Sequence, residues 1–88
     1  MTVDLALKNG IAVNLAGGTH HAHYDKGSGF CVLNDLAISA NRILNGNEKM
    51  KILILDCDVH QGDGTAAIFG TSHPNVYTLD LHLSLIHI

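Results

Sequence analysis

The sequence has no tryptophan, one proline and two cysteines among its 88 residues. Two cysteines cannot cross-link a small secreted protein, so a reducing compartment is favoured and we expect a cytoplasmic location. Charged residues make up 15% of the chain and hydrophobic residues 47%, which argues against intrinsic disorder. The length allows one small domain at most.

Basic residues and long apolar runs are also scarce. Five Lys and Arg residues stand against eight Asp and Glu residues, and no basic run could neutralise phosphates. No apolar stretch approaches the ~20 residues of a membrane span. Met1 leads into Thr-Val-Asp rather than into the basic and apolar segments of a signal peptide. We therefore expect neither nucleic-acid binding nor membrane association.

The first third of the chain predicts a helix, a strand and a long loop. Residues 2–8 have the pattern of the last turns of a helix, with Gly10 as its stop. Residues 11–15 form a short apolar run that favours a strand. Residues 16–30 are rich in glycine and histidine, and an unstructured loop of this length usually has a function.

Beyond this loop, helix and strand patterns alternate. Apolar residues recur at helical spacing over residues 33–44, with Asn34 placed to cap the helix and Gly46 to end it. The apolar run at residues 52–55 is typical of a strand covered on both faces. A short helix at residues 65–69 and a strand at residues 76–79 follow. Strands joined through helices predict an open α/β fold with a parallel sheet.

The two polar loops should lie at the carboxyl ends of strands, where parallel sheets form their sites. In the second loop Asp56, Asp58 and His60 alternate, so on an extended chain their side chains project to one side. Carboxylate with imidazole suits zinc or ferrous iron better than calcium. The alternative is that the aspartates cap the next helix and His60 is solvated.

Seven histidines are present, and three lie in the first loop as His20, His21 and His23. An adjacent pair can supply a general base and a general acid, because the imidazole pKa lies near neutral pH. A surface cluster or a His-rich metal tract is the alternative. We interpret His23, which is spaced differently, as a solvated loop residue. Asp63, between two glycines, is either a turn residue or a carboxylate that orients a histidine, a role also open to Asp56.

Both cysteines flank these loops. The spacing between Cys31 and Cys57 is not that of a zinc ribbon, so we expect each to be a small buried side chain. Phe30 is either a pocket wall or part of the core.

Three motifs, taken in order, resemble the successive signatures of the histone deacetylase family. They are GGTHHA at residues 17–22, GFCVLND at residues 29–35 and DCDVHQGDGT at residues 56–65. The resemblance covers roughly residues 5–82, and the order and spacing of all three motifs make it specific. The His60-Gln61 form is closer to bacterial and class IV-like members than to animal class I enzymes.

The resemblance implies a fold and a role for each motif residue. Family members are metal-dependent amidohydrolases with the arginase/deacetylase fold, an α/β structure with a three-layer open parallel sheet. This chain would hold a central βαβαβ portion, as a partial domain at residues 3–82 with an atypical tail at residues 83–88. The implied roles are His20, His21, Asp56 and Asp63 as catalytic residues, Gly29 and Phe30 as walls of the substrate channel, and Asp58 and His60 as metal ligands.

The resemblance also implies cofactors and substrates. Zn²⁺ is the expected metal, Fe²⁺ is an alternative, and K⁺ is expected as a structural ion near Asp56. The implied substrate is an acetylated lysine of a histone or other protein, or a small acetylated amine such as an acetylpolyamine. A non-catalytic metal- or acyl-binding remnant is the alternative. An arginase-type enzyme with two manganese ions is disfavoured, because the second loop has a one-metal pattern.

Two residues of the family's site have no match in this chain. The family's third metal ligand, an aspartate, and its transition-state tyrosine lie downstream of the last motif, and Asp80 and Tyr77 match neither. Asp58 and His60 therefore supply two ligands where a catalytic zinc needs three. We expect the 88-residue chain by itself to be inactive and a poor zinc binder.

Overall fold

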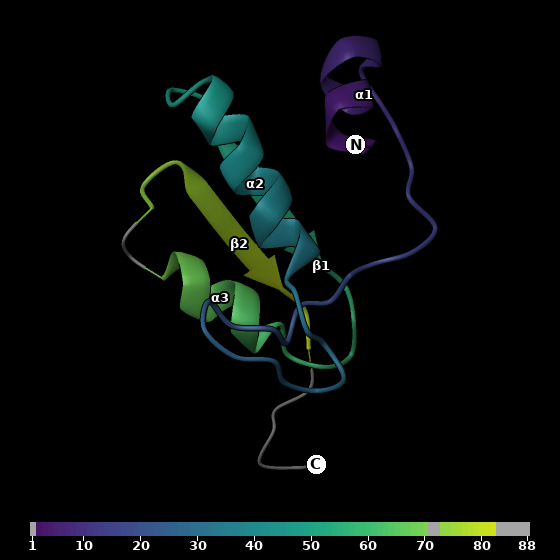
Figure 1. The fold of residues 1–88 in the computed structure, drawn as a ribbon, viewed down its shortest axis with the longest axis vertical. Coiled ribbons are helices and arrows are strands. Elements are labelled where there is room, and N and C mark those ends of the chain that lie inside the picture. Colours follow the sequence, from purple (N-terminus) through teal and green to yellow (C-terminus); the bar gives the residue numbers. More distant parts are fainter. Residues whose placement is uncertain (1, 71–72, 83–88) are drawn as a thin grey trace.

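The computed structural model describes residues 2–70 and 73–82. Figure 1 shows its elements in chain order, α1 (Thr2–Asn9), α2 (Asp35–Gly46), β1 (Ile52–Asp56), α3 (Asp63–Phe69) and β2 (Val76–Asp80). β1 and β2 run parallel, with Ile52 opposite Val76 and Asp56 opposite Asp80. The chain between them passes through α3. The predicted α/β architecture with a parallel sheet is confirmed.

α2 forms where the helical spacing of apolar residues predicted it. Asn34 caps it, because its side chain accepts a hydrogen bond from the backbone N–H of Ala37 at 3.0 Å. Ala37 and Ala40 form its buried face. Leu33, the first residue of the predicted stripe, precedes the helix and is 67% exposed. Gly46 is the last helical residue.

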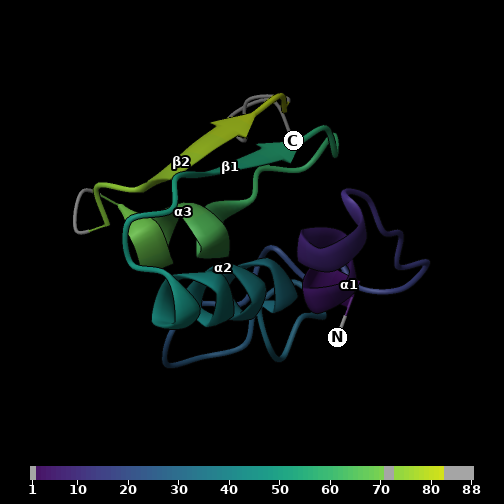
Figure 2. The ribbon, with the colours of Figure 1, turned by 90° about the horizontal axis from the view of Figure 1, so that it is seen from above.

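The core lies between one face of the two-stranded sheet and the helices. Figure 2 shows α3 and α2 on the same side of the β1–β2 pair. The buried cluster consists of Ala37, Ala40, Phe69 and Val76, with Leu44, Ile52, Ile54 and Ile68 packed against it. Most of these side chains are small, so Phe69 carries much of the buried apolar volume.

The opposite face of the sheet is exposed in the part of the chain that the structure describes. Leu53 is 63% exposed and Leu55 is 56% exposed, and their register partners Tyr77 and Leu79 are also exposed. The expectation that residues 52–55 are covered on both faces is therefore wrong for this chain. Alternate side chains point to opposite faces, and helices cover one of them.

Residues 11–15 are not a strand, which corrects the prediction. They follow α1 as an open loop (Figure 1), and Leu15 is 98% exposed. A strand needs a neighbour for its ladder, and this segment pairs with neither β1 nor β2. The order in the described residues is therefore α-α-β-α-β rather than βαβαβ.

The expectations for the tail at residues 83–88 lie outside the described residues. Within residues 2–70 and 73–82, no helix combines the length and the apolar character that crossing a bilayer requires.

The two phenylalanines of the sequence give a matched test of the core. Phe69 is 1% exposed, whereas Phe30 is fully exposed. Truncating a buried Phe typically costs ~3–5 kcal/mol, and a domain of this size has a total stability of about the same magnitude. We expect Phe69→Ala to abolish the far-ultraviolet circular dichroism of the folded chain and Phe30→Ala to preserve it. Equal loss in both variants would contradict this core.

Candidate active site

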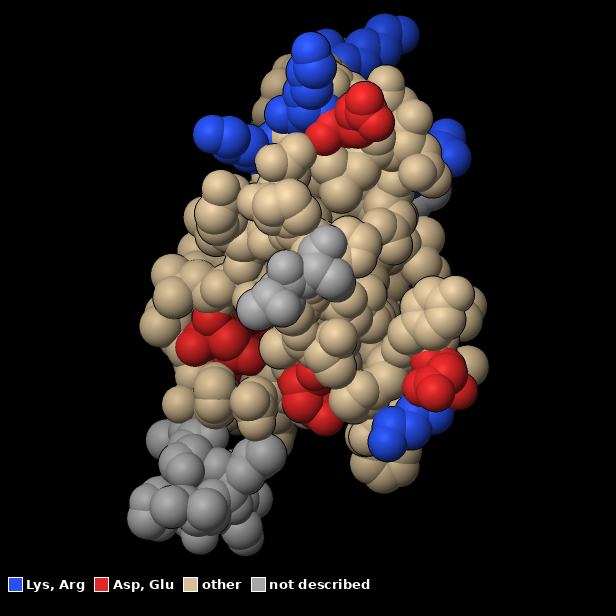
Figure 3. Space-filling view, turned by 90° about the vertical axis from the view of Figure 1, so that its left-hand side faces the viewer, with Lys and Arg blue, Asp and Glu red and all other residues tan. Residues whose placement is uncertain are grey.

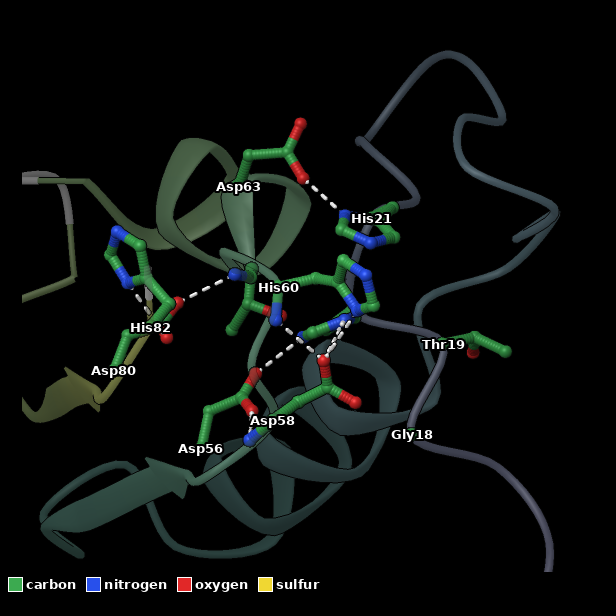
Figure 4. A network of polar contacts seen from close by, with 12 residues as sticks. Gly18, Thr19, His21, Asp56, Asp58, His60, Asp63, Asp80 and His82 are labelled. Atoms are coloured by element: carbon green, nitrogen blue, oxygen red, sulfur yellow. Dashed lines mark hydrogen bonds and ion pairs between the residues drawn. The ribbon is translucent and has the colours of Figure 1, made fainter. Parts of the chain in front are cut away.

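The polar residues of the two loops meet where β1 and β2 end. Asp56 and Asp80 are the last residues of their strands and lie opposite each other in the register. Figure 4 shows His21 beside the segment that carries Asp58 and His60, with Asp63 at the start of α3. The candidate residues of both loops thus gather at the carboxyl end of the sheet, although the first loop does not follow a strand as predicted.

His20 is paired with the first aspartate of the strand end. Its Nδ1 is hydrogen-bonded to Oδ2 of Asp56 at 2.5 Å, and the imidazole is buried. A carboxylate on Nδ1 holds the proton of a neutral imidazole there and leaves Nε2 as the base. That Nε2 lies 4.0 Å from Oδ1 of Asp58. The free nitrogen of His20 thus faces the predicted metal ligands.

His21 has a carboxylate of its own. Its Nδ1 is hydrogen-bonded to Oδ1 of Asp63 at 2.7 Å. The rings of His20 and His21 lie side by side with centroids 4.3 Å apart, and the ring of His60 lies 6.3 Å from that of His21. Asp63 is therefore more than a turn residue. Each of the two adjacent histidines is therefore paired with its own aspartate, as the sequence allowed for Asp56 and Asp63.

His23 also contacts Asp63, so its interpretation as a solvated residue was wrong. Its Nε2 lies 3.2 Å from Oδ2 of Asp63. Burial raises the pKa of Asp63, but the hydrogen bonds from His21 and His23, a backbone hydrogen bond and the charge of His21 lower it, and the net pKa falls below the usual range. The signal in the sequence was the period of two, which puts His21 and His23 on one side of an extended chain.

Asp58 and His60 form a separate exposed pair. Oδ1 of Asp58 accepts hydrogen bonds from the backbone N–H of His60 at 2.7 Å and lies 2.9 Å from its Nδ1. These hydrogen bonds hold the pKa of Asp58 below its usual range. Oδ2 of Asp56 is directed at His20, and its Oδ1 accepts the backbone N–H of Asp58 at 2.9 Å. Asp56, Asp58 and His60 were predicted to project to one side together. Instead, Asp58 pairs with His60, and the carboxylate of Asp56 pairs with His20.

The Asp58–His60 pair fits two positions of a zinc site. Its carboxylate oxygen and imidazole nitrogen are zinc ligands by type, and at 2.9 Å apart they can converge on one cation. No group of three or more His, Cys, Asp or Glu side chains placed to hold a metal occurs in residues 2–70 and 73–82. The residues therefore fit two of the three protein ligands that a catalytic zinc site needs.

The surface charge around the site is negative. Figure 3 shows acidic side chains in the lower half of that face, whereas most Lys and Arg side chains gather at its upper end. The site residues include Asp56, Asp58, Asp63 and Asp80, without a neighbouring Lys or Arg in any of their ion pairs. Such a field favours a cation.

Gly29 and Phe30 lie at the rim of the histidine pair. A Cβ on Gly29 would come within 2.6 Å of the ring of His21, so the backbone passes directly over that imidazole. Phe30 has a φ of 64° and a fully exposed ring. A bulky residue at positive φ is strained. The ring stands out from the loop beside the site and does not belong to the core.

Cys31 and Cys57 differ in their surroundings. Cys31 is buried as expected, but Cys57 is exposed, which corrects that prediction. Cys57 follows Asp56 at the end of β1, and alternation turns its side chain away from the covered face.

Asn34 and Asp35, the last two residues of the GFCVLND motif, hold the histidine loop in addition to starting α2. Asn34 is buried, and its amide nitrogen donates to the carbonyl of Ala22 and to Oγ of Thr65, both at 3.0 Å. Asp35 accepts hydrogen bonds from the backbone N–H groups of residues 18 and 19 at 2.9 Å. The start of α2 therefore holds the chain on both sides of His20 and His21.

Comparison with known proteins identifies the family. A family model of the histone deacetylase domain matches residues 1–87. The chain belongs to the histone deacetylase family. The parallel α/β structure is consistent with part of the domain of that family, and the resemblance of the three motifs is confirmed.

Proteins similar to this chain occur in bacteria and eukaryotes. An uncharacterized protein of Picosynechococcus is 55% identical over 93% of this chain and 27% of its own length. Histone deacetylase clr6 of Schizosaccharomyces pombe is 43% identical over 82% of this chain and 17% of its own length. The acetoin utilization protein AcuC of Staphylococcus aureus is 37% identical over 90% of this chain and 21% of its own length. The chain thus spans about a quarter or less of the length of these relatives.

The contact between α3 and the histidine loop depends on Gly64. A Cβ at this position would lie 2.2 Å from the carbonyl oxygen of Ala22, which is backbone and cannot rotate away. The next residue, Thr65, donates its N–H to the carbonyl of His20 at 3.1 Å. Gly64 therefore lets the helix approach the loop closely enough to hold His20.

We expect Gly64→Ala to destabilise the chain by ~1–3 kcal/mol, as overpacking does, because the loop must move away from α3. Gly46→Ala is the matched control, since a Cβ there meets no atom within 4 Å. The control should be neutral or stabilising by ~0.5–1 kcal/mol, because alanine favours a helix. Urea unfolding followed by circular dichroism measures both. Equal effects at the two positions would contradict the close approach.

Proposed function

We propose that this chain carries the two catalytic dyads and two metal ligands of a zinc-dependent deacetylase. The substrate would be an acetylated lysine of a protein or a small acetylated amine. The observation that supports the proposal is the pairing of two adjacent histidines with separate aspartates, beside an Asp–His pair of zinc-ligand type. Membership in a family whose named members include histone deacetylases points the same way.

Asp58 and His60 would hold the zinc together with ligands from outside this chain. When bound, the zinc would polarise the amide carbonyl and make a water molecule more acidic. The exposure of both side chains leaves room for the metal and for substrate atoms. Fe²⁺ suits the same ligands, and backbone oxygens near Asp56 would take K⁺.

His20 is suited to accept the proton of the attacking water. Its Nε2 lies beside the metal ligand Asp58, and Asp56 fixes the Nδ1–H tautomer that leaves this nitrogen free. Burial of His20 holds the ring in one orientation. A fixed ring keeps the base near the position where the water would be held.

His21 is suited to hand a proton to the departing amine. Asp63 keeps its negative charge to lower pH than an ordinary carboxylate, because its pKa is lowered by the histidines that surround it. This charge stabilises a protonated His21. A protonated imidazole can then supply the proton that the leaving amine needs.

The exposed Phe30 would form part of the wall along the acylated chain of the substrate. An apolar wall favours the uncharged acetylated amine over the ammonium ion, whose desolvation is costly. The alternative function, a non-catalytic metal- or acyl-binding remnant of the same fold, would keep this geometry without turnover. Turnover by the full-length protein would distinguish the deacetylase from the non-catalytic remnant. We also propose that the enzyme is cytoplasmic.

The mechanism predicts the effect of His21→Ala in the full-length protein. Loss of a general acid–base group typically costs ~10²–10⁴-fold in rate, and we expect kcat/KM on an acetyl-lysine peptide to fall by that order. His73→Ala, at the other end of β2, should retain its activity per folded molecule. Removal of zinc by a chelator and its return should abolish and restore turnover. Near-parental activity of His21→Ala would remove this residue from the mechanism.

A second prediction concerns the 88-residue chain alone. Asp58 and His60 supply two ligands, so calorimetry should detect zinc binding only weaker than micromolar, and no deacetylation should be measurable. Asp58→Ala should weaken the binding further, whereas Asp25→Ala, in an exposed part of the loop, should not. Submicromolar one-to-one binding that Asp58→Ala abolishes, together with turnover, would contradict the two-ligand interpretation.

A further inference from the structure

The segment that leads into the tandem histidines is bound to a single carboxylate. Oδ2 of Asp35 accepts the backbone N–H of Gly18 at 2.9 Å, and Oδ1 accepts the backbone N–H of Thr19 at 2.9 Å. The hydroxyl of Thr19 lies 2.9 Å from the same Oδ1 and also contacts the carbonyl of Leu33. Both carboxylate oxygens are therefore engaged with the two residues immediately before His20.

The approach of this backbone to Asp35 is closer than an ordinary residue allows. Gly17 has a φ of 111°, and a Cβ there would lie 2.2 Å from Oδ2 of Asp35. The chain thus turns around the carboxylate through a conformation that favours glycine. Burial raises the pKa of Asp35, but the hydrogen bonds from Gly18 and Thr19 lower it below its usual range, so the carboxylate is ionised at neutral pH.

The residue after the histidines is held by the neighbour of Asp35. Asn34 donates its side-chain N–H to the carbonyl of Ala22 at 3.0 Å, and its Oδ1 caps α2. Asn34 and Asp35 are consecutive and lie at the rigid start of a 12-residue helix. Both ends of the segment from Thr19 to Ala22 are therefore bound to the same helix start, Thr19 by Asp35 and Ala22 by Asn34.

We propose that Asp35 is a positioning residue for His20 and His21. It contacts neither imidazole, and acts by fixing the backbone of Gly18 and Thr19. That backbone sets where the two Nδ1 atoms meet Asp56 and Asp63. The kinetic part of this proposal rests on the proposed deacetylase function, whereas its spectroscopic part does not.

The experiment uses the full-length protein with Asp35→Asn. The amide keeps the shape of the carboxylate, but it presents an NH₂ group to one of the two backbone N–H donors and loses that bond. Asp25→Asn is the matched control, because it removes the same charge from an exposed position in the same loop. Circular dichroism of each variant gives the folded fraction by which activity is normalised.

The first readout is independent of activity. Long-range ¹H–¹⁵N spectra of histidine-labelled protein report the tautomer of each imidazole. In Asp35→Asn we expect the His20 signals to move from the Nδ1–H tautomer toward a mixture and the His21 signals to shift as well, with the His73 signal unchanged. A residue that only stabilised the fold would leave the imidazole signals of the folded molecules in place.

The second readout is kinetic. Misplacement of catalytic groups by about 1 Å costs ~10²-fold in rate, so kcat per folded molecule should fall by ~10- to 100-fold in Asp35→Asn. KM should change by less than about twofold, because the metal ligands and Phe30 belong to other segments. Asp25→Asn should match the parent in both constants.

A second pair of variants covers the case in which Asp35→Asn does not fold. Thr19→Val keeps the shape of the side chain and removes the hydroxyl that lies against Asp35, whereas Thr19→Ser retains it. We expect Thr19→Val to reproduce the imidazole shifts and the kcat loss in weaker form, and Thr19→Ser to restore the parental values.

The outcomes separate the two proposals. Parental imidazole spectra in both Asp35→Asn and Thr19→Val, or in Thr19→Val alone if Asp35→Asn is unfolded, would overturn the positioning role. Imidazole shifts in a protein whose parent form does not deacetylate would support the positioning role and refute the proposed function. An active parent with shifted spectra but unchanged kcat would show that the orientation of the pair does not limit turnover, which overturns the role in catalysis.

Discussion

The hydrogen bond between Nδ1 of His20 and Oδ2 of Asp56 joins the two halves of the site. It connects a loop residue with the last residue of β1, 36 positions away in the chain. Both side chains are largely removed from solvent, so separating them would leave two polar groups without partners in a poorly hydrated place. This cost ties the histidine loop to the sheet. His21 and His23 lie in the same loop, so the bond between His20 and Asp56 also restricts their positions.

α2 provides the second fixed reference for the same loop. Its capping residue and its first residue bind the backbone before and after the histidine pair, so a helix start serves as a platform for the site. α3 approaches from the third side, where Gly64 allows Thr65 to reach the carbonyl of His20. Each imidazole is thereby oriented by contacts that do not involve substrate, as the proposed acid–base pair would require.

The histidine pairs of the candidate site are complete within this chain, whereas the predicted metal ligands are not. The two histidine dyads are closed by hydrogen bonds within this chain, whereas the side chains of the Asp58–His60 pair are exposed. Within residues 2–70 and 73–82, the outer face of the sheet is likewise exposed at Leu53 and Leu55. A chain that spans about a quarter or less of its relatives thus contains two closed carboxylate–histidine pairs, which we propose as proton-transfer groups, and the Asp58–His60 pair, which we propose as two metal ligands.

The sequence determined the helices, the parallel strands and the identity of the chemical groups. Periodicity and the Asn34 cap predicted α2 because local spacing and local hydrogen bonds define a helix. The order of the three motifs predicted the family and the two carboxylate–histidine pairs. Tertiary structure alone decided that residues 11–15 form no strand, because a ladder requires a neighbour, and that His23 contacts Asp63. It also decided that Asp35 binds the loop, since contacts 16 and 17 residues apart depend on how α2 is placed and leave no periodic trace in the sequence.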